Sequence, residues 1–430
     1  MQFFGTSGIR NIVTRDLLGL AYKVGMAVGK AYGDVVVGND TRTSSGVMKH
    51  SVISGLLAAG ARCGDVGIVP TPTLAFVTRE FHAGVMITAS HNPPEYNGIK
   101  LWNPDGSAFN SVQQGQVEEV LLSDSLDIAP WMEMKNCIWH SGAAEQHMDR
   151  ILSNFPGKLN ARVVVDAGCG AAAEVTPHLL TRLGCEVIAI NCYHSGFFPH
   201  DIEPIESNLG ELIKSVKGSG AAVGIAHDGD ADRMMAVDDK GRFIPGDKLL
   251  AILVQAVGAG DVVTTVDASM VIDEMGFSIR RTRVGDAAVS EELRNGGDFG
   301  GEPSGSWIFP GVSLCPDGIY AAAQIAAIAS QQKLSELVDS LPSYPILRGN
   351  IRTDGAVLSG LEESLAALEP ISTGNIDGIK LRFKDGWLLV RASGTEPKIR
   401  LTAEARSRKR VSQLYESGVK AIESCLKVGP

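Results

Sequence analysis

Short runs of β-branched residues alternate along much of the chain with longer stretches rich in alanine and leucine. Four such runs end in glycine, aspartate or histidine-aspartate, at 35–38, 162–168, 222–228 and 261–267. Helical patterns follow three of them, at 51–59, 171–183 and 269–275. Because strands that alternate with helices build parallel sheets with helical crossovers, this part of the chain predicts an α/β fold.

The C-terminal segment follows a different pattern. Strand-like runs at 378–384 and 387–391 are joined by Asp385-Gly386, a dipeptide typical of tight hairpins. An amphipathic pattern over 408–426 then predicts a final helix. Antiparallel strands followed by one helix indicate an α+β unit, unlike the three units before it.

The length of 430 residues exceeds what one hydrophobic core usually supports. The α/β pattern returns in units of roughly 100 residues, an ordinary domain size. Polar, proline-containing stretches at 123–131 and 341–345 are candidate linkers. We therefore expect four domains, at 1–140, 141–240, 241–343 and 344–430.

The charge balance argues against a nucleic-acid partner. The net charge is −10, and no run of lysine or arginine stands out before 406–410. Binding to nucleic acid needs a basic face, and we interpret this short run as a solvated helix face. The longest apolar stretch, 249–260, is too short to span a bilayer, so no membrane segment is expected.

Cysteine usage and the N-terminus bear on the compartment. The chain has seven cysteines, an odd number, with no Cys-x-x-Cys spacing. This pattern is typical of free thiols in a reducing cytoplasm and favours neither disulfides nor a zinc site. The sequence opens without the basic and apolar regions of a signal peptide, so a cytoplasmic location is predicted. Monomer and homo-oligomer are both left open.

The strongest chemical signal is the acidic loop 228–233, in which Asp228, Asp230 and Asp232 alternate with small residues. Three carboxylates this close repel one another and raise their pKa values unless a cation lies between them. Ligands that are all oxygens select a hard cation such as Mg²⁺. An EF-hand is disfavoured because Arg233 stands where its loop requires glycine. The loop predicts a metal site, with a solvated acidic turn as the alternative.

A second signal is Ser90, which follows the apolar run 85–87 in a loop stiffened by Pro93 and Pro94. Open α/β sheets place reactive groups at the carboxyl ends of strands, which makes Ser90 a candidate nucleophile. The plainer interpretation is a helix N-cap serine. No Gly-x-Ser-x-Gly sequence surrounds it, so a hydrolase triad is not indicated.

The surroundings of Ser90 add weaker signals. His91 follows directly in the sequence and is expected to point elsewhere. The segment 96–100 is expected to form a turn that ends in Lys100. The glycine-containing loop 5–10, which ends in Arg10, is a further candidate for anion binding.

Two more loops carry groups suited to a sugar phosphate. In 301–305, two glycines and a proline hold a loop that offers Glu302 and Ser304 to neighbouring hydroxyls, with a plain surface turn as the alternative. In 391–400, two arginines, two hydroxyls and a glycine follow a strand. Such a loop makes a phosphate cradle, with an exposed basic turn as the alternative.

Together these loops resemble the α-D-phosphohexomutase superfamily over nearly the full length of the chain. The motifs occur in the family's order, at 6–10, 88–100, 228–233, 301–305 and 391–400. The resemblance implies three related mixed-sheet α/β domains and a smaller C-terminal α+β domain, heart-shaped around a central cleft. It also implies an intramolecular phosphotransferase that interconverts hexose 1-phosphates and 6-phosphates through a phosphoserine and a 1,6-bisphosphate intermediate.

The resemblance implies roles residue by residue. Ser90 matches the phosphoserine, and Asp228, Asp230 and Asp232 match the ligands of one Mg²⁺, with the serine phosphate as a further ligand. Arg10, His91 and Lys100 match positions beside the reacting phosphate. Substrate contacts are implied for Arg233, Glu302, Ser304, Arg391, Ser393, Gly394, Thr395 and Arg400. A glucose-1,6-bisphosphate-type activator is implied as well, and the four domains would carry phosphoserine, metal, sugar and distal phosphate in turn.

Two departures from the family pattern leave the sugar open. Ser306 and Trp307 stand where many relatives have histidine, and Ala287 stands where arginine or histidine is common. Such substitutions resemble an archaeal branch. Glucose and mannose phosphates are the favoured substrates, and glucosamine phosphate with the same mechanism is the alternative. More distant alternatives are a non-catalytic sugar-phosphate-binding protein and a phosphatase.

Overall fold

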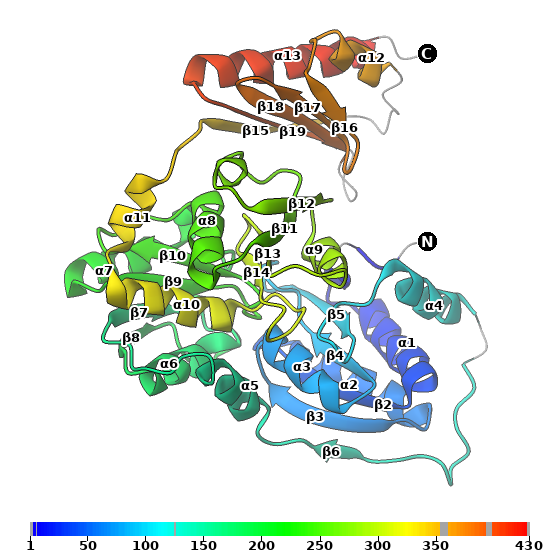
Figure 1. Cartoon of the computed structure of the whole chain (residues 1–430). Helices are drawn as coiled ribbons and strands as arrows, with labels where there is room; N and C mark the ends of the chain where they lie inside the picture. The colour runs from blue at the N-terminus through cyan, green and yellow to red at the C-terminus, as the bar shows by residue number, and fades with distance from the viewer. Residues whose placement is uncertain (1–2, 6, 124–125, 353–359, 393–397, 428–430) are drawn as a thin grey trace.

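The computed structural model describes residues 3–5, 7–123, 126–352, 360–392 and 398–427. Four β-sheets follow one another along the chain, and each is covered by helices (Figure 1). The first three sheets belong to α/β units, while the fourth carries its helices on one face. This arrangement of three α/β units and a C-terminal α+β unit confirms the predicted fold class.

The first sheet has six strands in the order β1-β5-β4-β2-β3-β6. They are β1 (Ile9–Ile12), β2 (Asp34–Asn39), β3 (Arg62–Ile68), β4 (Ala83–Ile87), β5 (Tyr96–Trp102) and β6 (Cys137–Trp139). Its helices are α1 (Arg15–Tyr32), α2 (Ser45–Ala58), α3 (Thr71–Val77), the 3₁₀ turn η1 (Thr78–Glu80) and α4 (Ser111–Leu122). The prediction of a turn at 96–100 was wrong. This segment belongs to β5, whose backbone pairs antiparallel with both β1 and β4.

The second sheet has the order β10-β9-β7-β8. Its strands are β7 (Arg162–Asp166), β8 (Glu186–Ile190), β9 (Val223–His227) and β10 (Met234–Asp238). Its helices are α5 (Ala143–Leu152), α6 (Ala172–Arg182), the 3₁₀ turn η2 (Glu206–Asn208) and α7 (Gly210–Ser219). β7, β8 and β9 are parallel as expected, but β10 runs antiparallel to β9. The loop 228–233 between them is too short for a helical crossover, so the chain must turn back.

The third sheet has the order β12-β11-β13-β14. Its strands are β11 (Asp261–Thr265), β12 (Ser278–Thr282), β13 (Phe299–Glu302) and β14 (Ser306–Ile308). Its helices are α8 (Gly246–Val257), the 3₁₀ turn η3 (Ile272–Glu274), α9 (Asp286–Leu293), α10 (Gly318–Gln331) and α11 (Leu334–Ser340). Within the described part of the chain, no helix has the length and apolar character needed to cross a membrane.

The helix expected at 269–275 is only the turn η3. The backbone N–H groups of Ser269 and Met270 donate to Asp247 and Glu404, carboxylates from distant parts of the chain, each at 2.7 Å. These tertiary contacts hold the segment in an irregular conformation that its composition does not reveal.

The fourth sheet is antiparallel throughout, in the order β15-β19-β18-β17-β16. Its strands are β15 (Ile346–Arg352), β16 (Ser372–Gly374), β17 (Ile379–Phe383), β18 (Gly386–Ala392) and β19 (Lys398–Ala405). Its helices are α12 (Leu361–Ala366) and α13 (Arg408–Lys427). The predicted hairpin at Asp385-Gly386 joins β17 to β18, and the predicted amphipathic helix is α13.

One hydrophobic core extends through the first three units and draws on all three of their sheets, and the first unit has a second core of its own. His147 of α5 is fully buried. One ring nitrogen lies 3.0 Å from Thr73 Oγ1 and the other lies 3.0 Å from Asp317 Oδ2. Thr73 belongs to α3 of the first unit, and Asp317 caps α10. This continuous core and the contacts of His147 hold the first three units in fixed positions relative to one another.

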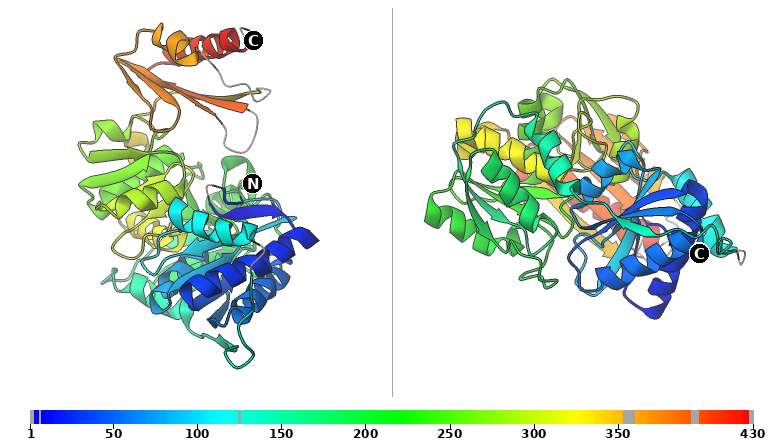
Figure 2. Two further views of the ribbon diagram at one scale, coloured as in Figure 1. Left: turned by 90° about the vertical axis from the view of Figure 1, so that its right-hand side faces the viewer. Right: turned by 90° about the horizontal axis from the view of Figure 1, so that it is seen from below.

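The fourth unit has its own core and a smaller contact with the third. Val266 packs there against Trp387 and Leu389. The buried carboxylate of Glu404 accepts hydrogen bonds from the Trp387 indole at 2.6 Å and from Ser269 Oγ. The left view of Figure 2 shows this unit against the third and away from the first. A separate core on a limited contact favours movement of the fourth unit as a body.

Candidate active site

Ser90 and the acidic loop meet although 138 positions separate Ser90 from Asp228 in the chain. Ser90 lies just beyond β4, and the acidic loop follows β9 directly, so both occupy the carboxyl ends of strands. Ser90 Oγ donates a hydrogen bond of 2.6 Å to Asp228 Oδ2. The structure thus brings the candidate nucleophile against the candidate metal ligands.

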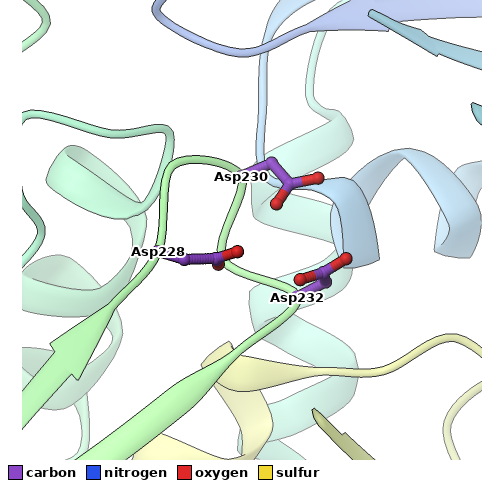
Figure 3. A group of neighbouring side chains, drawn as sticks. All are labelled: Asp228, Asp230 and Asp232. Atoms are coloured by element: carbon purple, nitrogen blue, oxygen red, sulfur yellow. The ribbon is translucent and has the colours of Figure 1, made fainter. Parts of the chain in front are cut away.

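The three aspartates of the acidic loop point toward one another (Figure 3), and one oxygen of each lies within 4.8 Å of the others. All three residues are buried. Ala231, between them, has a φ of 57°, a left-handed conformation that costs a non-glycine residue of order 1 kcal/mol. This strained backbone conformation accompanies the arrangement in which the three carboxylates point toward one another.

Burial and mutual repulsion shape the charge of this cluster. Burial, reinforced by Asp232 and Asp230, raises the pKa of Asp228 well above its usual value. Burial acts in the same direction on Asp230, but the Lys100 ammonium outweighs it and the pKa of Asp230 is lowered. Lys100 Nζ lies 2.7 Å from Asp230 Oδ2 and 2.5 Å from Asp232 Oδ2. A single ammonium therefore serves two of the three carboxylates.

The donor set fits a divalent cation. Asp230 Oδ1 and Asp232 Oδ1 are buried and have no hydrogen-bond partner among the described residues. A buried carboxylate oxygen without a partner is costly unless an ion supplies the missing interaction. Mg²⁺ prefers oxygen ligands of this kind. Such an ion would also relieve the repulsion that raises the pKa of Asp228.

The surroundings of Ser90 differ from one expectation. His91 does not point away, because its Nδ1 lies 3.3 Å from Ser90 Oγ. Burial and then three nearby cations lower the pKa of His91 to about 2, so the ring is neutral. These cations are Arg233, Arg10 and Lys100. Arg10 Nε is itself buried without a partner in the part of the chain described. This concentration of positive charge suits an anionic phosphoryl group.

The candidate sugar loop, 301–305, packs against the end of the acidic loop. Met234 N donates to Gly305 O at 2.9 Å, and the Trp307 indole donates to Met234 O at 2.8 Å. Trp307 is completely buried. It therefore links β14, which follows the loop 301–305, to β10, which follows the acidic loop.

Glu302 ends β13 and is only 7% exposed. Gly285 N donates to its Oε1 at 2.7 Å, and Ser304 Oγ lies 3.3 Å from its Oε2. Burial raises the pKa of Glu302 to about 7, and the charges of Asp286 and Asp267 act in the same direction. Glu302 is thus a carboxyl group whose ionisation falls near neutral pH.

This raised pKa predicts a pH-dependent stability. The pKa of Glu302 rises from 4.5 to about 7 in the folded chain, so the stability linked to its protonated form is lost as pH rises through 7. In Glu302→Gln, the fall in melting temperature between pH 5 and pH 8 should be smaller than in the wild type. The difference corresponds to roughly 3 kcal/mol at most. Thermal unfolding without Mg²⁺ measures it, with the exposed Glu186→Gln as control. Equal pH slopes in Glu302→Gln and wild type would contradict the assignment.

The two arginines predicted to bind phosphate lie in the fourth unit. Arg391 and Arg400 lie directly opposite each other on β18 and β19. Arg391 Nη2 pairs with Asp377 at 2.7 Å, and Asp377 Oδ2 also accepts the N–H of Val284 at 2.9 Å. Asp377 thereby links Arg391 to Val284, and the residue after Val284 is Gly285, which donates to Glu302. The remaining predicted contacts, Ser393, Gly394 and Thr395, lie outside the described residues.

Some residues that hold the site were missed by the sequence reasoning. Thr71 Oγ1 donates to Asp230 Oδ2 at 2.6 Å, and Arg42 Nη2 donates to the carbonyl of Ser90 at 2.8 Å. Arg42 lies just beyond β2, and Thr71 lies just beyond β3. A search for polar residues after every predicted strand would have found both.

Comparison with known families gives a match along almost the entire chain. The phosphoglucomutase/phosphomannomutase family matches through its α/β/α domains I, II and III, at residues 1–126, 145–241 and 245–344. Its C-terminal domain matches residues 352–420.

Individual proteins agree. A probable phosphoglucosamine mutase from Methanocella arvoryzae is 46% identical and is covered to 99%, as is this chain. A phosphoglucosamine mutase from Methanocaldococcus jannaschii is 41% identical, again with 99% of both covered. The crystal structure of a phosphoglucomutase/phosphomannomutase family protein from Burkholderia thailandensis superimposes with a TM-score of 0.87 at 27% identity, covering 99% of this chain and 98% of that one. This chain therefore belongs to the phosphoglucomutase/phosphomannomutase family, and it is a phosphohexomutase, an isomerase that moves a phosphoryl group within a hexose phosphate.

Proposed function

We propose that this enzyme interconverts glucosamine 6-phosphate and glucosamine 1-phosphate. This substrate was the alternative in the sequence analysis, and glucose or mannose phosphate was the favoured one. The relatives from Methanocella and Methanocaldococcus carry the name phosphoglucosamine mutase, which supports the change of preference.

The observation that carries this proposal is the excess of carboxylates around the sugar loop. Asp286 and Asp267 both act to raise the pKa of Glu302, and Arg233 acts against them. Ala287 adds no cation at the position where the family often has arginine or histidine. A protonated amino group on the sugar is attracted by such a surplus of negative charge, whereas a hydroxyl gains much less.

The transfer itself is proposed to run through Ser90. In the resting enzyme Ser90 would carry the phosphoryl group, which passes to the free hydroxyl of a bound sugar monophosphate. The resulting 1,6-bisphosphate turns over in the cleft and returns its other phosphate to Ser90. Lys100 and Arg10, whose charges act on His91, would neutralise the phosphoryl oxygens. His91, 3.3 Å from Ser90 Oγ, would hydrogen-bond to the group on Ser90.

Asp228, Asp230 and Asp232 would hold one Mg²⁺, with the phosphate of Ser90 as a further ligand. When bound, the ion would supply charge neutralisation on the transferring group. Arg391 and Arg400, with Ser393, Gly394 and Thr395, would bind the phosphate at the far end of the substrate. Glu302 and Ser304 would bind sugar hydroxyls, and Arg233 a phosphate. A hexose 1,6-bisphosphate would act as activator by restoring phospho-Ser90.

In this proposal each unit has one task. The unit of 1–140 carries the phosphoserine, 141–240 the metal, 241–343 the sugar and 344–430 the distal phosphate. One distal site can then serve both orientations of the bisphosphate, provided that the fourth unit opens and closes.

A mutase assay with a trace of hexose 1,6-bisphosphate tests the substrate. With Mg²⁺ present, kcat/KM for glucosamine 1-phosphate should exceed that for glucose and mannose 1-phosphates by about tenfold or more, equivalent to about 1.4 kcal/mol. Asp286→Asn should reduce this preference because it removes one carboxylate, while the exposed Asp149→Asn should leave it unchanged. A preference for glucose or mannose 1-phosphate would return the assignment to the other candidate, which the name of the Burkholderia protein favours.

A further inference from the structure

The segment after β2 packs under the Ser90 loop. Its residues Asp40, Thr41 and Arg42 are 0%, 6% and 3% exposed. The Arg42 guanidinium makes five hydrogen bonds there. Nε donates to Asp40 Oδ2 at 3.1 Å. The two terminal nitrogens donate to four backbone carbonyls of the loop, those of Ser90 (2.8 Å), Asn92 (2.6 Å), Pro93 (2.7 Å) and Tyr96 (3.0 Å).

These bonds close a circuit through Ser90. Ser90 N donates to Thr88 Oγ1 at 2.9 Å, and Thr88 Oγ1 donates to Asp40 Oδ2 at 2.7 Å. Asp40 binds Arg42, and Arg42 Nη2 returns to Ser90 O at 2.8 Å. Both backbone polar groups of Ser90 are therefore fixed by buried side chains of its own unit.

These hydrogen bonds stabilise an unfavourable backbone conformation of Ser90. Ser90 has a φ of 52°, a left-handed conformation that persists in a non-glycine residue only when its surroundings enforce it. Four carbonyls converge on one planar cation, and a guanidinium offers donors in the fixed fork that this arrangement requires. The ammonium of lysine is a compact charge with three donors, so it cannot reproduce all five bonds.

The same segment also reaches the acidic loop. Thr41 Oγ1 donates to Cys169 O at 2.8 Å, in the turn that follows β7. Ala171 N, two residues later, donates to Gly229 O at 2.9 Å. The Arg42 guanidinium lies over the ring of Phe198 in the second unit, with Cζ 5.1 Å from the ring centroid. The segment 40–42 thus contacts the Ser90 loop directly and the metal-binding loop through one intervening turn.

We propose that Arg42, together with Asp40 and Thr88, is a positioning group that sets Ser90 Oγ against the metal site for phosphoryl transfer. The inference rests on the proposed role of Ser90. Arg42 does not touch the reacting atoms, since its bonds go to carbonyls and to Asp40. Its effect is on the chemical step, because the sugar and the distal phosphate are bound by other units.

Arg42→Lys tests the inference, with Arg62→Lys as the matched control. Arg62 lies in the same unit and forms an exposed ion pair with Asp34. In Arg42→Lys, kcat on glucosamine 1-phosphate should fall by about 100-fold, as expected for a nucleophile misplaced by about 1 Å. KM should stay within about twofold, and the rate of Ser90 phosphorylation by glucose 1,6-bisphosphate, followed by intact mass, should fall in parallel. Arg62→Lys should behave as wild type.

A second pair of variants covers the case in which Arg42→Lys does not fold. Thr88→Val keeps the shape of the side chain but breaks the circuit, whereas Thr88→Ser keeps the hydroxyl. Loss of kcat in Thr88→Val and its recovery in Thr88→Ser would support the inference. A kcat within about threefold of wild type in Arg42→Lys and Thr88→Val would overturn it, as would a loss matched by an equal change in KM. Ser90→Ala separates the two levels, because activity retained there would reject the role of Ser90 itself.

Discussion

Ser90→Ala is expected to abolish mutase activity, with kcat lowered by at least roughly 10⁴-fold, because the proposed transfer runs through the Ser90 hydroxyl. The hydroxyl lies 2.6 Å from Asp228 and 3.3 Å from the neutral ring of His91.

Three measurements test this prediction. Activity is measured with glucosamine 1-phosphate and a trace of bisphosphate. Intact mass of the wild type after incubation with the bisphosphate should show one phosphate, which Ser90→Ala should lack. The melting temperature should change little, because the variant loses one hydroxyl. Ser54→Ala is a suitable control, since Ser54 is exposed on α2 of the same unit. Activity within tenfold of wild type would show that phosphoryl transfer bypasses Ser90.

Asp228→Asn is expected to have opposite effects on metal binding and on stability without metal. Burial and the neighbouring Asp232 and Asp230 already raise the pKa of Asp228. The neutral amide removes this burial cost and repulsion of a charged carboxylate, so the metal-free melting temperature should hold or rise. Mg²⁺ affinity should fall at least roughly 100-fold, since changes behind the ligands alone cost 10–100-fold. kcat at fixed Mg²⁺ should fall with it.

Calorimetric titration with Mg²⁺ and thermal unfolding in chelator separate these effects. Asp149→Asn, an exposed change in the same unit, should alter neither quantity. A clear loss of stability in chelator with unchanged Mg²⁺ affinity would mean that Asp228 serves the fold and not a metal.

Local patterns foretold much of the fold. The hairpin at Asp385-Gly386 and the helix over 408–426 follow from turn chemistry and amphipathic spacing, which act within a few residues. The prediction of a turn at 96–100 was wrong because this segment forms β5, which lies between β1 and β4 and pairs its backbone with both. The helix expected at 269–275 failed because the carboxylates of Asp247 and Glu404 bind the backbone there. In both cases a distant part of the chain outweighed local preference.

The candidate site divides in the same way. Residue type and spacing alone singled out the acidic loop, Ser90 and the loop that carries Glu302, because carboxylates two residues apart and a hydroxyl beyond a strand carry their chemistry in the sequence. Nothing in the spacing indicated that Arg42 would bind four carbonyls some 50 residues away, or that Thr71 would support Asp230.

By itself, therefore, the sequence determined the class of reaction, and it indicated which loops are candidates for the chemistry and what ion would suit them. Only the tertiary structure decided that Ser90 meets Asp228, that Trp307 of β14 binds Met234 at the start of β10, and that Lys100 lies between two aspartates. The physical reason is that ligand chemistry is a property of side chains in short segments. Distances, burial and the pKa shifts they cause depend on how separate sheets pack around a shared core.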